Sequence, residues 1–232
     1  MNDPSFHQPM FEIKRPRPRR FTGPESPLWG AKCRELLEKE DEQFDWRDYQ
    51  ALFSELESIG TYEESVYFLP QAFSRILTHR EEALDMIDSV LGFCSYNAGR
   101  LDSDGALQAV RTAIRIFLNT WTAHFRATPN EVQVLDESLG ILIRKRVHMD
   151  IAEEFVLALS RSLQDPARAS WFLKLAVYVD GGYSELPAHA PMVEIVRGED
   201  FLVAAAATVR KRLSELGEES GYLDYCLDQL GL

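Results

Sequence analysis

The sequence predicts an all-α protein, an irregular bundle or stack of about ten antiparallel helices with a disordered basic N-terminal tail. Apolar side chains recur three and four residues apart from residue 26 to residue 230, which is the period of one helix face. Helix-start signals fall between these runs. Thr61 with Glu64 makes a capping box, and Thr128 with Glu131 makes another.

The clearest helix is predicted over Ser103–Phe125, where the polar residues fall on the side opposite the apolar ones. The apolar positions are Leu107, Val110, Ile114, Phe117, Leu118, Trp121 and Phe125. A helix with one fully apolar face organises a core, and this one carries no catalytic or ligand motif.

Further along, Trp171–Val179 holds only one polar residue, Lys174, so we expect a helix buried on nearly all sides. A β-strand is the alternative, because the segment ends in residues that favour sheet. Asp165–Pro166 before it and two glycines after it favour the helix. Residues 183–199, which contain Pro187 and Pro191, are predicted to be a loop.

Two details are predicted near the N-terminus. Ser26 followed by Pro27 should open the first helix, with Trp29 on its buried face. Pro70 interrupts a later helical run and predicts a kink or two short helices there.

The domain organisation predicted is a tail over residues 1–25 and a single helical domain over 26–232, with two lobes, about 26–126 and 128–232, as an alternative. The tail holds five prolines, and its first twenty residues carry five bases against two acids. It is either an arm for nucleic acid or an acidic partner, or a solubilising tail that lies loosely on its own acidic body. Either way, deletion of residues 1–24 is expected to leave folding unaffected.

The formal net charge of the chain is -12, which disfavours nucleic acid and anionic lipid and favours a basic partner, although many ordinary cytosolic proteins are also acidic. Cys33, Cys94 and Cys226 lie among apolar neighbours and are expected to be buried free thiols in a reducing compartment. No run of about 18 apolar residues predicts a membrane helix. We therefore expect a cytoplasmic protein without membrane contact.

The motifs of common chemistries do not occur in the sequence. It has no Cys-x-x-Cys pair, no His-Glu-x-x-His, no glycine-rich phosphate loop and no Gly-x-Ser-x-Gly nucleophile elbow. No catalytic residue, cofactor or metal ligand is therefore predicted.

One stretch stands out as a candidate binding site. Residues 38–48 hold six acids against two bases, with two aromatic residues among them. Aromatic anchors inside an acidic rim suit a basic protein surface. The predicted partner-binding residues are Glu40, Asp41, Glu42, Phe44, Asp45, Trp46 and Asp48. The alternative is that Phe44 and Trp46 face the core and the acids form a solvated turn.

From these observations we expect a non-enzymatic, acidic helical protein-binding module that sequesters or positions a basic protein partner, for example an immunity-type inhibitor or an adaptor. One alternative is an enzyme whose active site is dispersed over several helices without a local motif. The other is a nucleic-acid-binding protein that acts through the basic tail.

Overall fold

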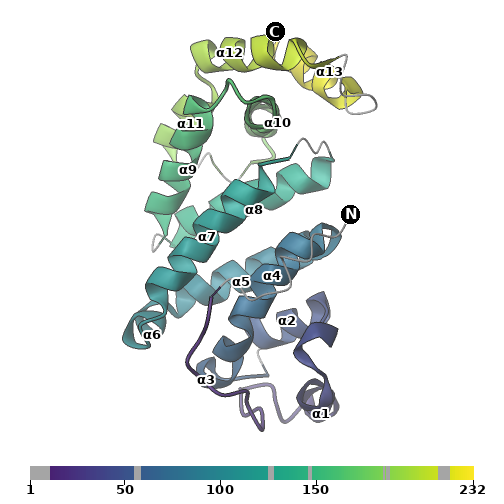
Figure 1. Cartoon of the computed structure of the whole chain (residues 1–232), viewed down its shortest axis with the longest axis vertical. Helices are drawn as coiled ribbons and strands as arrows, with labels where there is room; N and C mark the ends of the chain where they lie inside the picture. Colours follow the sequence, from purple (N-terminus) through teal and green to yellow (C-terminus); the bar gives the residue numbers. More distant parts are fainter. Residues whose placement is uncertain are drawn as a thin grey trace. The chain divides into compact units, whose positions relative to one another are not determined.

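The computed structural model describes residues 11–54, 59–124, 128–145, 148–184, 186, 189–213 and 220–232, and the regular elements of these residues are all helices (Figure 1). The predicted all-α architecture is confirmed. The chain forms two compact units, residues 1–114 and 115–232. The division falls inside one helix, α7 (Leu107–Trp121).

Unit 1 is built around aromatic side chains. Helix α2 packs against α5, and α4 also packs against α5. The elements of unit 1 are α1 (Gly30–Glu38), η2 (Asp41–Gln43), α2 (Trp46–Phe53), α3 (Tyr62–Ser65), η3 (Val66–Phe68), α4 (Leu69–Thr78), η4 (Arg80–Glu82), α5 (Ala83–Tyr96), α6 (Ala98–Ser103) and the first half of α7, where η marks a 3-10 helix. Between them they bury Phe44, Tyr49, Phe53, Phe68, Phe73 and Phe93.

The first helix begins later than predicted. Ser26–Pro27 lies in a turn, in which the backbone N–H groups of Leu28 and Trp29 both donate to the carbonyl of Glu25. Helix α1 therefore starts at Gly30, and Trp29 is 50% exposed rather than buried. A turn that satisfies its own backbone groups competes with helix at such a proline-containing start.

The break predicted at Pro70 is confirmed. A 3-10 helix, η3, precedes α4, and Pro70 stands in the first turn of α4. The N–H that proline lacks would have had no partner within the helix at that position, so the residue is tolerated there.

The N-terminal tail has a described part, residues 11–25, and it contains no helix, as expected. These residues nevertheless contact the body of unit 1. Phe21 is buried and packs near Phe68, and the backbone N–H and hydroxyl of Thr22 both donate to Glu64, at 2.8 and 2.7 Å. Residues 11–24 therefore make specific contacts with unit 1, and the expectation that the tail is dispensable for folding stays a prediction. Residues 1–10 lie outside the described residues.

Unit 2 packs its helices around α10. The main neighbours of α10 are α12, α13 and α8. The elements of unit 2 are the second half of α7, α8 (Pro129–Lys145), α9 (Met149–Arg161), α10 (Pro166–Asp180), α11 (Ala190–Val196), α12 (Glu199–Arg210) and α13 (Ser220–Gln229).

The helical prediction for α10 is confirmed, since Asp165 caps its N-terminus by accepting from the backbone N–H of Ala167 at 2.8 Å. Lys174 is fully buried, with its ammonium 5.1 Å from the centroid of the Trp171 ring. The predicted loop over 183–199 contains helix α11. Pro191 stands in its first turn, where proline does not oppose helix formation.

The organising helix is shorter than predicted. Residues 98–103 form the separate helix α6, and Gly105, with a φ of 69°, turns the chain before α7 begins at Leu107. The predicted end at Phe125 lies outside the described residues. Among the described helices, none is both long and apolar enough to cross a membrane.

Candidate functional site

The predicted acidic site lies at the start of α2, where the structure uses Asp45 and Asp48 to form the helix. The Asp45 carboxylate accepts from the backbone N–H of Arg47 at 2.9 Å and from that of Asp48 at 3.2 Å. In return the Asp48 carboxylate accepts from the backbone N–H of Asp45 at 2.9 Å. This reciprocal capping box fixes the direction in which α2 leaves the turn.

Asp48 is the centre of a buried ion-pair cluster. Its side chain is 0% exposed, and its two oxygens accept from the ammonium groups of Lys32 and Lys39, the second at 2.9 Å. Burial alone would raise the pKa of Asp48, but the hydrogen bonds from Lys32, from the Asp45 N–H and from Lys39 outweigh it and hold the pKa below its ordinary value. Asp48 is a structural residue and offers no surface to a partner.

Phe44 and Asp41 also have internal partners. Phe44 is 1% exposed and stacks on Phe68 with ring centroids 4.9 Å apart, so the alternative that Phe44 faces the core is confirmed. Asp41 accepts from the Tyr67 hydroxyl at 2.8 Å and pairs with the guanidinium of Arg17 at 3.3 Å. Burial, followed by the hydrogen bond to Asp41, raises the pKa of Tyr67 to about 12.

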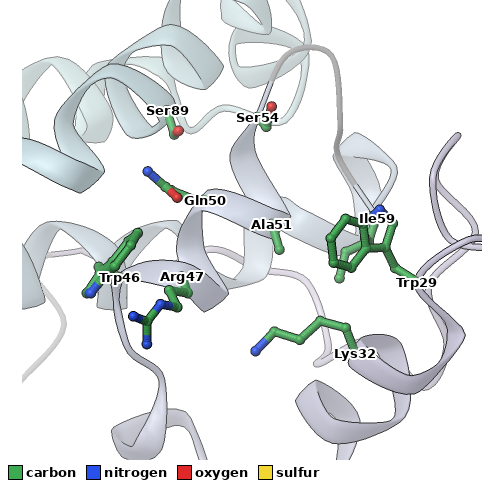
Figure 2. Close-up of a pocket in the computed structure, with 9 residues that line it drawn as sticks. All are labelled: Trp29, Lys32, Trp46, Arg47, Gln50, Ala51, Ser54, Ile59 and Ser89. Carbon is green, nitrogen blue, oxygen red and sulfur yellow. The ribbon is translucent and has the colours of Figure 1, made fainter.

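The remaining predicted residues stay accessible. Glu40 and Glu42 are exposed, while Asp45 and Trp46 are half-buried. Trp46 opens onto a groove of about 620 Å³ beside α2 (Figure 2). The groove is lined by Trp29, Lys32, Trp46, Arg47, Gln50, Ala51, Ser54, Ile59 and Ser89.

Two tryptophans flank this groove. Figure 2 shows Trp46 and Trp29 on opposite sides, with Gln50 and Ala51 of α2 between them. The guanidinium of Arg47 lies 4.7 Å from the centroid of the Trp46 ring, a cation–π contact. Leu28, next to Trp29, is 80% exposed.

The other two tryptophans of the chain behave differently. Trp121 and Trp171 are both 0% exposed, and their indole N–H groups donate to the backbone carbonyls of Glu131 and His124, at 3.0 and 2.8 Å. That is the ordinary state of a core tryptophan. The two tryptophans that remain partly exposed, Trp29 and Trp46, both line the groove.

Two described lining residues contact acidic residues outside the lining. Glu35 pairs with Lys32 at 3.1 Å, and the carbonyl of Asp85 accepts from the side chain of Gln50 at 2.7 Å. Both Asp85 and Asp88, on α5, are exposed. Lys32 pairs with Glu35 and Asp48, and both carboxylates also pair with Lys39, so these four charges offset one another.

Among the lining residues that the structure describes, the titratable groups are Lys32 and Arg47, and these do not bring together a nucleophile and a base. Within the part of the chain that the structure describes, no three His, Cys, Asp or Glu side chains gather as metal ligands. The three cysteines are buried free thiols, as expected, and burial raises the pKa of Cys226 to about 11.

Comparison with protein families, with characterised proteins and with solved structures finds no match for this chain. No relative supplies a function. The site residues that sequence reasoning missed are those brought to the groove from other elements, namely Trp29, Lys32, Ile59 and Ser89. The available signal was Leu28–Trp29, two consecutive large apolar residues that a single helix face cannot both bury.

Proposed function

We propose that the chain is a non-enzymatic protein-binding module, and that a basic protein partner docks in the groove beside α2 of unit 1. One observation carries the proposal. Trp29 and Trp46 stand partly exposed on opposite sides of a single groove, in a chain that fully buries its other two tryptophans. Aromatic side chains in this state are typical anchors of protein interfaces.

The groove offers enough apolar surface for such anchors. A tryptophan buries roughly 200 Å² when fully covered, so covering the exposed half of Trp29 removes about 100 Å² from water. At about 25 cal/mol per Å², this contributes roughly 2.5 kcal/mol. That is the size of a hot-spot contribution, before any contact with Leu28 or Trp46 is added.

Charge favours a basic partner. Asp85, whose backbone carbonyl accepts from the groove residue Gln50, is exposed, and the whole chain carries -12. Complementary charge of this kind accelerates encounter and excludes acidic competitors more than it tightens the final complex. The open face of Trp29 suits a partner cation, as the face of Trp46 already holds Arg47.

Sequestering or positioning a basic partner, as an immunity-type inhibitor or an adaptor does, needs only such a surface. The nucleic-acid alternative is weakened, because two of the five tail cations are committed within the chain. Arg15 pairs with Asp104, and Arg17 pairs with Asp41. No specific observation favours the enzymatic alternative.

The test is to select, from a random peptide display library, peptides that bind the full chain. We expect binders that combine an apolar or aromatic residue with arginine or lysine, and that lose at least tenfold in affinity for Trp29→Ala, as a hot-spot anchor implies. Tyr96→Ala is the matched control, since Tyr96 is a 75% exposed aromatic residue outside the groove lining. Acidic binders, or equal losses for both variants, would overturn the proposal.

A further inference from the structure

The described tail segment, residues 11–24 and here called the strap, crosses unit 1 with alternate residues directed to the body. The inward positions, which are partly buried, are Phe11, Ile13, Arg15 and Arg17, and the exposed positions between them are Glu12, Lys14 and Pro16. The backbone N–H of Arg15 donates to the carbonyl of Ile13 at 2.8 Å, so the alternation belongs to a non-helical chain that turns at this point with one side against the body. The side chains that face the body are therefore two apolar residues followed by two arginines.

Arg15 is held in a geometry specific to arginine. Its Nε and Nη2 donate to the two oxygens of Asp104, at 2.9 and 2.7 Å. The Tyr62 hydroxyl donates to the same carboxylate at 2.9 Å, and the Arg15 guanidinium lies 5.7 Å from the Tyr62 ring centroid. Lysine cannot form a bidentate pair of this kind.

Arg17 is held at the end of α1. Its guanidinium donates to the backbone carbonyls of Leu36 and Lys39 and pairs with Asp41. The last turn of α1 has no basic residue of its own, so Arg17 supplies the cation that the negative end of a helix favours. The Tyr67 hydroxyl donates to the Asp41 carboxylate and helps to orient it toward Arg17.

The middle of the strap is held by these side chains rather than by close packing. Cavities of about 450 and 530 Å³ lie beside it, the first lined in part by Ile13 and Asp104 and the second by Pro18 and Glu63. The side chains of Arg15 and Asp104 are 32% and 25% exposed. Ion pairs this open to water contribute weakly and are screened by salt.

We propose that this surface is a recognition site for a non-helical basic segment of a protein partner, with the pattern apolar-x-apolar-x-arginine-x-arginine. Residues 11–17 are then an intramolecular occupant that such a segment displaces. The side-chain pattern of the strap defines the chemistry of the ligand. The surface is a second binding site on unit 1, and its occupation does not depend on whether the groove binds a protein.

The test uses the full chain and a fluorescent peptide with the sequence of residues 11–18. In the double variant Arg15→Ala/Arg17→Ala the strap loses its charged contacts, so it should compete less with an added peptide. We expect saturable binding of the peptide to this variant, at least about tenfold tighter than to the wild-type chain, whose own strap competes at a millimolar effective concentration. Adding Asp104→Asn, or replacing both peptide arginines by lysine, should weaken binding at least about fivefold.

The proposal is overturned if the folded double variant binds no peptide up to about 1 mM, the range of that effective concentration. It is overturned equally if Asp104→Asn leaves binding unchanged. A second measurement covers a double variant that fails to fold. Millimolar peptide added to the wild-type chain should accelerate amide hydrogen exchange in residues 11–24, and unchanged exchange would contradict displacement of the strap.

Discussion

Replacing Asp48 by alanine tests the account of the α2 start most severely. The substitution removes three hydrogen bonds to a fully buried carboxylate, those from Lys32, Lys39 and the Asp45 backbone N–H. Breaking a buried ion pair by removing one partner destabilises a protein by about 3 to 5 kcal/mol. The lysines are each about a quarter exposed and both retain Glu35, so the lower end applies. We expect a loss of about 3 kcal/mol.

The assay is urea unfolding followed by circular dichroism, with Glu35→Ala as the matched control. Glu35 bonds the same two lysines but its side chain is 47% exposed, so its removal should cost less than about 1 kcal/mol. A loss below about 1 kcal/mol for Asp48→Ala, or equal losses for the two variants, would refute the reasoning.

The pH dependence of the stability tests the same contribution of Asp48. The folded pKa of Asp48 lies below its ordinary value, so its contribution to stability is present above about pH 4 and disappears as the pH falls through the folded pKa. The stability difference between the wild-type chain and Asp48→Asn should therefore shrink in acid. A difference that grew below pH 4 would mean that the carboxylate is not stabilised by its lysines.

Two further predictions concern the strap and the Arg75–Glu82 pair. Gly23→Ala should destabilise by about 1 to 3 kcal/mol in thermal unfolding, because a Cβ there would lie 2.6 Å from the backbone of Ile59, whereas Gly99→Ala, with open space around it, should be neutral or better. Equal effects would show that the strap does not pack where it is described. Glu82→Gln should lower stability by about 1 to 2 kcal/mol, since Glu82 accepts both hydrogen bonds of a bidentate pair with Arg75 and their side chains are only 20% and 16% exposed. The pKa of Glu82 is lowered, so the stability difference should disappear only when the pH falls below this lowered pKa and the carboxylate becomes protonated. A difference that persisted in such acid would show that the pair contributes no charge-dependent stability.

The helices were predictable because their signals are local. Capping at Asp45 and Asp165 and the proline in the first turn of α4 depend on residues within one turn of each other. The start of α1 was missed because Ser26–Pro27 also suits a turn, and only the later path of the chain decides between the two. The helix in residues 183–199 was missed because proline counts against helix unless its place in the first turn is known.

The site was less predictable because its residues come together only in the fold. The sequence pointed to Trp46 but could not decide whether it faces the core. In the structure Trp46 is half-buried and lines the groove. Sequence reasoning also treated the acids near residue 45 as one patch. Asp48 and Asp41 are instead neutralised by Lys32 and Arg17, which lie 16 and 24 positions away in the chain. A charge count along the sequence cannot anticipate such pairing.

The most direct test of the central claim is the affinity of a selected basic peptide for Trp29→Ala, measured beside the thermal stability of the same variant. Because half of Trp29 is already buried, its truncation should also lower the folding stability, by at most about 2.5 kcal/mol, so the affinity is measured where the variant is fully folded. The affinity should fall by at least tenfold and by up to about a hundredfold, the range expected for losing about 2.5 kcal/mol of apolar burial. Unchanged affinity of the folded variant would contradict the groove as the binding site.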